Sequence, residues 1–350
     1  MHKKLIHGGD VYRNRVAYDF SVNINPLGMP EQSMQAAMDA ILQANQYPDP
    51  IGEQLCEAIS YHKHIKKEQI VLGNGAAELL YALCFALRPK KVLTVAPTFQ
   101  EYEAAVHASG GEILYYYLNE KNEYAIDDKF VEQIAGDIDL VILCNPNNPT
   151  GSLADAELVR RIIVQCEKQH VKLCMDECFL EFVREGSERT YLKTDCPRHV
   201  IVLRAFTKIY AMAGLRLGYM YMTDDSLRDK IRSMLQPWNT SIPAQRAGIF
   251  ALCEEGYLEK TISLIEAERD YLTRQLVGMG AYVYHSDANY LLIRLDIECN
   301  LVKELLEKGI LIRDCSMFQG LGKGYYRIAI RSHSENVILI ENWKMVLAKE

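Results

Sequence analysis

Short apolar runs alternate with segments of helical periodicity from about residue 53 to residue 204, and this alternation limits the possible folds more than any other feature. Each apolar run predicts a buried strand. Strands that alternate with helices form mostly parallel sheets, which helices cover on both faces and which bind ligands at the carboxyl ends of the strands. We therefore expect an α/β fold with strands at 69–72, 91–96, 112–118, 138–144, 171–176 and 200–204, and with helices at 53–64, about 76–87, 100–109, 127–134 and 154–169.

The remaining sequence predicts an N-terminal arm and a smaller C-terminal domain. Residues 1–30 are rich in Gly, Asn and Pro and precede an expected helix at 31–43. Helices at 225–235 and 243–277 lead to a strand–strand–helix–strand–strand–helix pattern, with strands at 290–295 and 326–330 and a closing helix at 335–348. We expect three parts: the arm and first helix at 1–45, which pack with the small domain, a large domain at 46–245, and a linking helix with the small domain at 246–350.

The composition is that of an ordinary globular protein and excludes several classes of partner. The 350 residues are 49% hydrophobic and 24% charged, and the formal net charge is −7. A negative protein does not attract nucleic acid or anionic membranes through its overall field, so an anionic substrate would need a local cluster of arginines. The sequence shows no signal peptide and no apolar run near the roughly 18 residues of a membrane helix. Most of the ten cysteines lie in apolar segments, which favours a reduced, cytoplasmic protein.

Four features of the large domain fall at expected strand ends or helix starts, in a fixed order. They are the glycine turn 73–78, the loop Asn145-Pro-Asn-Asn-Pro-Thr-Gly151, Asp176 and Lys208. Taken singly, each has an ordinary explanation: a plain turn, a rigid loop, a helix cap or ion pair, and a surface lysine. Taken together, they predict polar and glycine-rich groups that gather at one edge of one sheet.

Lys208 lies between a hydroxyl and a guanidinium, those of Thr207 and Arg216. A desolvated lysine beside another cation loses its proton more readily and can then form a Schiff base with a carbonyl compound. Pyridoxal phosphate is a carbonyl cofactor that is held in this way, and its phosphate needs donors of the type that Thr207 and Arg216 supply. A strand-end carboxylate such as Asp176 would keep the ring nitrogen of this cofactor protonated.

In this order the four features resemble those of the fold-type I pyridoxal-phosphate enzymes of the class I/II aminotransferase superfamily, and the resemblance covers essentially the whole chain. It implies a mostly parallel, seven-stranded sheet in the large domain, a small α+β C-terminal domain, and pyridoxal 5′-phosphate as cofactor. Carried over by position, Lys208 is the Schiff-base lysine, Asp176 pairs with the ring nitrogen, Asn148 bonds the ring hydroxyl and Phe99 stacks on the ring. The phosphate contacts are Gly75, Ala76, Thr207 and Arg216.

The resemblance also implies a homodimer with shared active sites, because Tyr47 would reach the phosphate of the partner's cofactor. Phe179 departs from the pattern, since many aminotransferases have a tyrosine there that bonds the ring hydroxyl. We expect no metal site. His170, Cys174 and Cys178 have a helical metal spacing, but 171–176 reads as a strand, whose alternate residues point to opposite faces.

Within the superfamily the sequence is most similar to the L-threonine-O-3-phosphate decarboxylases of cobalamin biosynthesis. The similarity rests on 7–9, 19–28, Phe179, 207–211 and 312–316. It implies decarboxylation of L-threonine O-3-phosphate to (R)-1-aminopropan-2-ol O-phosphate. Arg327 would face the α-carboxylate and Arg313 the phosphate. The substrate contacts that the resemblance implies are His7, Gly8, Asn23, Asn148, Arg313 and Arg327.

Two alternatives remain open at this point. The first is an aminotransferase that acts on histidinol phosphate or a related amine with 2-oxoglutarate, because the departures at Met317, Gln319 and 238–243 concern the substrate and no motif selects the bond that breaks. The role of Arg331 is equally open. The second is a non-catalytic regulator that binds pyridoxal phosphate, although the arm is too short for a DNA-binding domain and Asp176 and Lys208 are both present.

Overall fold

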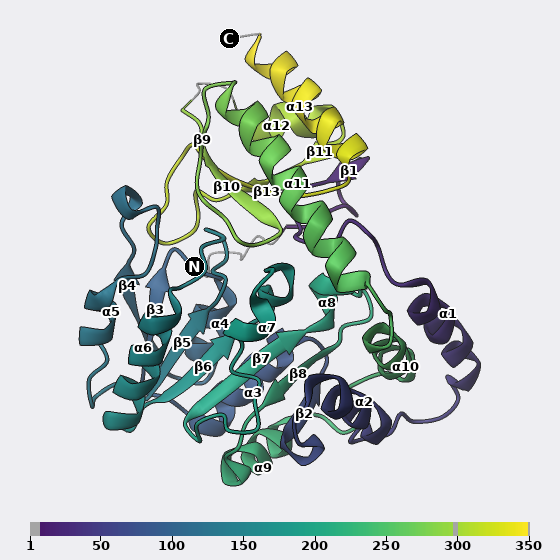
Figure 1. Cartoon of the computed structure of the whole chain (residues 1–350), viewed down its shortest axis with the longest axis vertical. Coiled ribbons are helices and arrows are strands. Elements are labelled where there is room, and N and C mark those ends of the chain that lie inside the picture. The colour runs from purple at the N-terminus through teal and green to yellow at the C-terminus, as the bar shows by residue number, and fades with distance from the viewer. Residues whose placement is uncertain (1–7, 297–299, 349–350) are drawn as a thin grey trace.

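The computed structural model describes residues 8–296 and 300–348. Its largest element is a seven-stranded sheet in the lower part of Figure 1, in which one strand runs antiparallel to both of its neighbours and the others are parallel. In spatial order the strands are β2 (Ile70–Gly73), β8 (Gly218–Tyr221, the antiparallel one), β7 (Val200–Ala205), β6 (Lys172–Asp176), β5 (Leu140–Cys144), β3 (Lys91–Ala96) and β4 (Glu112–Tyr117).

Helices surround this sheet, and the mostly parallel α/β arrangement expected from the sequence is confirmed. β5 and β7 are buried along their whole length, as expected for strands that are covered on both faces. The helices of this region are α2 (Glu53–Lys63), α3 (Ala76–Leu87), α4 (Glu101–Ala108), α5 (Asp128–Glu132), α6 (Ala156–Lys168), α7 (Gly186–Arg189), α8 (Phe206–Ile209) and α9 (Asp225–Met234), with short 3-10 helices at Lys67–Gln69, Glu120–Asn122 and Leu180–Phe182.

A smaller antiparallel sheet lies above the large one in Figure 1. Its strands in spatial order are β12 (Arg313–Asp314), β13 (Tyr325–Ala329), β10 (Tyr290–Arg294) and β9 (Tyr282–Val283). The N-terminal arm contributes β1 (Tyr18–Asp19), which pairs in parallel with β11 (Ile310–Leu311). The other helices are α1 (Glu31–Ala40), a 3-10 helix (Ile41–Gln43), α10 (Ile242–Leu252), α11 (Tyr257–Val277), α12 (Leu301–Glu307) and α13 (His333–Leu347).

Three expectations about secondary structure are wrong. The single helix expected at 243–277 is two helices, α10 and α11, because Gly256 adopts a left-handed backbone with φ of 70° between them. The strand β8 was not expected, since its four residues directly follow the loop that carries Arg216. Three strands, rather than two, follow α12. The border expected at residue 245 falls inside α10, which packs against α1 and α2.

The carboxyl ends of the parallel strands face the C-terminal region, residues 257–296 and 300–348 (Figure 1). The long helix α11 runs from beside the large sheet to beside the small one, so it connects the two layers. Within the described residues, no helix combines the length and the apolar character that a membrane crossing requires.

Candidate active site

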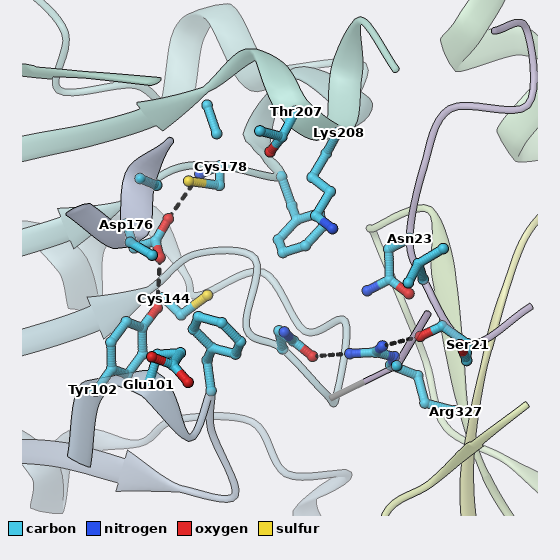
Figure 2. Close-up of a pocket in the computed structure, with 18 of the residues that line it drawn as sticks. Ser21, Asn23, Glu101, Tyr102, Cys144, Asp176, Cys178, Thr207, Lys208 and Arg327 are labelled. Atoms are coloured by element: carbon cyan, nitrogen blue, oxygen red, sulfur yellow. Dashed lines mark hydrogen bonds between the residues drawn. The ribbon is translucent and has the colours of Figure 1, made fainter. Parts of the chain in front are cut away.

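A cavity of about 470 Å³ lies between the carboxyl edge of the large sheet and the small sheet. Figure 2 shows side chains from both sheets and from the N-terminal arm that point into it. Ten of the fourteen site residues expected from the sequence line this cavity, although they come from distant parts of the chain. They are Gly8, Asn23, Ala76, Phe99, Asn148, Asp176, Thr207, Lys208, Arg216 and Arg327.

The other four residues singled out do not line the cavity. Gly75 directly precedes Ala76 and lies against Arg216. Arg313 is buried behind the wall, in register with Arg327 on the neighbouring strand. Tyr47 is 77% exposed and stacks on Trp238, with 4.4 Å between ring centroids. His7 lies outside the described residues.

Lys208 follows β7 in the one-turn helix α8 and projects into the centre of the cavity (Figure 2). Burial, followed by the positive charges of Arg327 and Arg216, lowers the pKa of its ammonium group to about 8. A lysine that deprotonates near neutral pH can act as a nucleophile toward a carbonyl carbon and can exchange protons with a bound ligand.

Asp176, at the end of β6, places its carboxylate on the opposite side of the cavity from Arg327 (Figure 2). The Tyr102 hydroxyl donates to Asp176 Oδ2 at 2.7 Å, and the Cys178 amide donates to Oδ1 at 3.0 Å. Burial, followed by the Asp176 charge, raises the pKa of Tyr102 well above its ordinary value, so the phenol stays protonated and remains a donor. Asp176 is therefore a buried carboxylate that is held by two donors and can still accept a further one from a ligand.

Tyr102 is a site residue that the sequence reasoning missed. It lies in the first turn of α4, and its ring meets the ring of Phe99 edge to face, with 5.6 Å between centroids. The sequence contained an indication of this role, because Phe99 and Tyr102 are three residues apart at the start of a helix and residues at that spacing lie on the same face. Phe99 had been assigned to the site, so Tyr102 could have been expected beside it.

An anion subsite forms where α3 begins. The first N–H groups of this twelve-residue helix have no partner within the helix, and its dipole favours negative charge there. Gly75 has φ of 82°, and a Cβ at this position would lie 2.6 Å from Arg216 Nη2. The absence of a side chain at Gly75 thus lets the guanidinium approach the helix start. Thr207 lines the cavity as well, with its hydroxyl-bearing side chain.

Arg327 reaches the cavity from β13 and is held at several points. Its Nη1 donates to Asn148 Oδ1, and its Nη2 donates to the Ser21 carbonyl at 2.7 Å (Figure 2). The guanidinium also lies over the ring of Tyr290, 5.5 Å from its centroid. Burial lowers the pKa of Arg327 from its ordinary value. These contacts fix one cation of the C-terminal region against the loop that follows β5.

The loop that presents Asn148 is rigid because its neighbour Asn147 is fully bonded. Asn147 Nδ2 donates to the Pro97 carbonyl at 3.0 Å and to Thr150 Oγ1 at 2.9 Å. The Thr98 hydroxyl donates to Asn147 Oδ1 at 2.8 Å. The loop after β5 is thus tied to the loop after β3, which carries Phe99.

The N-terminal arm folds back over the cavity. The Gly9 amide donates to Ser21 Oγ at 2.7 Å, and Ser21 Oγ donates to Asp19 at 2.6 Å. Gly8 packs so closely that a Cβ there would lie 2.4 Å from the Ser21 carbonyl oxygen. Asn23 Oδ1 is buried and has no hydrogen-bond partner among the described residues. An unsatisfied buried acceptor beside a cavity fits a site that binds a ligand with a polar hydrogen.

Phe179 lines the cavity and meets the ring of Tyr290 edge to face, with 5.0 Å between centroids. The Tyr290 hydroxyl donates to the Asn147 carbonyl at 2.8 Å, so neither ring offers a free hydroxyl to a ligand.

A buried ion pair lies behind the cavity, on the faces of β6 and β7 that point away from it. Arg204 Nε donates to Glu177 Oε2 at 3.0 Å, and both side chains are at most 5% exposed. The Thr190 hydroxyl donates to the same carboxylate at 2.6 Å. Glu177 follows Asp176, and Arg204 precedes the segment that carries Lys208, so this pair ties together the two strands that position them.

Four cations surround the cavity or lie directly behind it: Lys208, Arg216, Arg313 and Arg327. None of the four forms an ion pair with another described residue. Arg313 and Arg327 are buried and Lys208 is partly buried. Positive charges in such places are costly without counter-ions, so this arrangement fits a site whose ligands carry negative charge. The donors at the start of α3 with Arg216, the lysine and Asp176 fit the phosphate, the carbonyl and the ring nitrogen of pyridoxal phosphate in turn.

Known proteins are similar to this chain in sequence and in fold. The family model for aminotransferase class I and II matches residues 16–342. The threonine-phosphate decarboxylase of Salmonella typhimurium is 36% identical over 94% of this chain and 91% of its own. The histidinol-phosphate aminotransferase of Clostridium acetobutylicum superposes with a TM-score of 0.88 at 30% identity, covering 95% of this chain and 100% of that one. The histidinol-phosphate aminotransferase of Sinorhizobium meliloti, solved with pyridoxal-5′-phosphate, shares the fold with a TM-score of 0.85 at 22% identity, over 99% and 96% of the two chains.

Proposed function

We propose that this chain, which belongs to the class I and II aminotransferase family, is a pyridoxal-phosphate enzyme that decarboxylates L-threonine O-3-phosphate. The product would be (R)-1-aminopropan-2-ol O-phosphate, in the side-chain branch of cobalamin biosynthesis. The observation that carries the proposal is the pair of buried arginines, Arg313 and Arg327, which have no carboxylate partner among the described residues and lie beside a cavity that already holds Lys208. The relative named threonine-phosphate decarboxylase, similar over nearly the whole chain, supports it.

The residues present fit pyridoxal phosphate. Lys208 would carry it as a Schiff base, Asp176 would pair with its ring nitrogen, and Phe99 would cover one ring face. The donors of the anion subsite would hold its phosphate; they come from Gly75, Ala76, Thr207 and Arg216. The cofactor, when bound, supplies an electron sink for the bond that breaks at the substrate Cα.

Within this frame the side chains of the protein orient the substrate and move one proton. The arginines hold the two anionic ends of the substrate, so they decide which bond at Cα stands perpendicular to the cofactor ring. Decarboxylation requires the bond to the carboxylate in that position. Lys208 Nζ, with a pKa of about 8, can hold a proton near neutral pH and deliver it to Cα after carbon dioxide leaves.

The second candidate function is transamination of histidinol phosphate or a related phosphorylated amine with 2-oxoglutarate. The 30% identical aminotransferase of Clostridium acetobutylicum, with its TM-score of 0.88, favours it. The same residues would serve, but the bond from Cα to hydrogen would stand perpendicular to the ring, and Lys208 would move that proton to the cofactor.

One experiment separates the two functions. The protein purified with pyridoxal phosphate is offered L-threonine O-phosphate, and carbon dioxide release is measured. In parallel it is offered histidinol phosphate with 2-oxoglutarate, and glutamate is measured. We expect carbon dioxide from the first mixture and little glutamate from the second. Robust glutamate formation without decarboxylation would reverse the ranking, and a colourless protein that retains no cofactor would reject both functions.

We also propose a homodimer in which Tyr47 reaches the cofactor phosphate of the partner subunit. The proposal is supported by large apolar side chains exposed on and around α1, a pattern that marks interaction surfaces. Sedimentation should show a dimer, and substitution of two central side chains by charged residues, as in M38E/L42E, should give monomers with reduced activity. The exposed side chains are Met34, Met38, Ile41, Leu42, Tyr47, Ile51 and Trp238.

A further inference from the structure

We infer that Gln100 is a positioning residue that holds Arg313 for the phosphate group of the substrate; this inference rests on the proposed function. Gln100 lies at the start of α4, directly after Phe99. Its Oε1 accepts from Arg313 Nη2 at 3.2 Å, and its Nε2 donates to the Met317 carbonyl at 2.9 Å. One amide of the large-sheet region therefore holds both the guanidinium and the chain segment that follows it.

The surroundings of Arg313 show what the amide contributes. Arg313 is 7% exposed, and its guanidinium lies over the ring of Phe318, 5.4 Å from the centroid. Among the described residues, the hydrogen-bond acceptor for its side chain is Gln100, and no carboxylate pairs with it. A guanidinium has five donor hydrogens, so one neutral acceptor leaves most of them without a partner among the described residues.

Arg313 and Arg327 lie opposite each other on β12 and β13 but are differently engaged. Both Nη atoms of Arg327 already donate to Asn148 and Ser21. Arg313 is held at one point by Gln100, so it has more donors to offer a phosphate, which accepts several charge-assisted hydrogen bonds at once. This difference supports the assignment of the phosphate to Arg313 on grounds that are independent of any relative.

The neutrality of the amide is the important property. A glutamate at position 100 could accept the same hydrogen bond, but its charge would neutralise Arg313 and compete with the phosphate. An aliphatic side chain would leave the guanidinium without its acceptor and free to turn. Glutamine fixes the orientation of Arg313 and preserves its full positive charge for the ligand.

The test compares three variants, Gln100→Leu, Gln100→Glu and Gln165→Leu, with the wild type, each purified with pyridoxal phosphate. Gln165 is the control, because its Nε2 also donates to a backbone carbonyl, that of Ile134 at 2.9 Å, but outside the cavity. Calorimetry measures binding of L-threonine O-phosphate, of histidinol phosphate and of inorganic phosphate. KM and kcat are measured with whichever substrate turns over.

We expect Gln100→Leu to weaken binding of all three phosphate compounds about tenfold, the effect of one lost hydrogen bond to a charged group. Gln100→Glu should weaken binding further, and Gln165→Leu should leave it unchanged. The change should fall on KM rather than kcat. The visible absorption band and the retention of the cofactor should not change, which would separate a role in phosphate binding from a general loss of structure.

Binding is measured apart from turnover, so the outcomes for Gln100 and for the proposed reaction are distinct. If the wild type binds phosphate esters but releases no carbon dioxide, the decarboxylase function is rejected. The affinities of the Gln100 variants then still decide the inference about Gln100. Affinities within twofold of the wild type in Gln100→Leu would overturn the inference. The inference would also be overturned if Gln100→Leu lost cofactor retention to the same extent as phosphate binding. A wild type that binds none of the three phosphate compounds would overturn it as well.

Discussion

Replacing Lys208 by methionine should stabilise the cofactor-free protein, although it removes the central group of the site. The folded environment lowers the pKa of Lys208 from the ordinary 10.5 to about 8, chiefly through burial. Methionine has a similar length and no charge, so it fills the same space without this penalty. The variant Lys208→Met therefore tests whether the lysine is held at a cost to stability for the sake of its chemistry.

The magnitude and its pH dependence follow from proton linkage. At pH 7 both states bind the proton, and the folded state bears a cost of about 3 kcal/mol for holding it in the cavity. Between pH 8 and pH 10.5 the unfolded chain still binds the proton that the folded chain has released, so the stability of the wild type rises with pH in this window. The advantage of Lys208→Met should therefore be about 3 kcal/mol below pH 8 and should vanish near pH 10.5.

The assay is urea-induced unfolding of the cofactor-free proteins at several pH values, because a bound cofactor would itself stabilise the folded state. Lys129→Met is the matched control at an exposed position, and it should change stability little at any pH. The reasoning is refuted if Lys208→Met is no more stable than the wild type at pH 7, or if its advantage is the same at pH 7 and pH 10.

Further variants test other parts of the site. Gly75→Ala should release the cofactor more readily, because the added Cβ would meet Arg216 and the backbone has φ of 82°. Equilibrium dialysis would measure the release, and unchanged cofactor retention would contradict the prediction. Tyr102→Phe should lower the free energy of unfolding by about 2 kcal/mol, because buried Asp176 loses a hydrogen-bond donor. Thermal unfolding that matches the wild type would show that the hydrogen bond from Tyr102 to Asp176 does not stabilise the fold. Glu177→Gln should lower the free energy of unfolding by about 3 kcal/mol, because its buried arginine partner in β7 loses its closest counter-charge. An unchanged free energy in urea unfolding would show that the ion pair is dispensable.

The positions of Asn148, Asp176 and Lys208 could be predicted from the sequence because each lies at the end of a strand or in the short segment that follows one. Parallel strands place their carboxyl ends at one edge of a sheet, so residues far apart in the chain meet there whatever the details of packing. The local pattern also predicted most strands and helices, because burial on two faces makes each strand a continuous apolar run. It failed at Gly256, where one backbone conformation divides a helix without changing the periodicity on either side.

The contacts of Tyr102, Gln100 and Ser21 could not be predicted with the same reasoning. Tyr102 and Gln100 lie on one short helix, but their partners are a strand end and an arginine of the C-terminal region. Ser21 meets Arg327 through its backbone carbonyl, which any residue type would supply, so its identity carries no signal for that contact. Hydrogen bonds of this kind depend on distances between elements, which a local pattern does not contain.

The sequence by itself thus determined most strands of the sheet, the chemistry available at its carboxyl edge and the order of the groups there, because these follow from periodicity and from residue type at strand ends. Only the tertiary structure decided how the two arginines differ. Arg327 is engaged by Asn148 and Ser21, whereas Arg313 keeps most of its donors beside a single neutral amide. The physical reason is that the charge of a guanidinium is a property of the residue, whereas its availability to a ligand depends on which acceptors the fold brings within hydrogen-bonding distance.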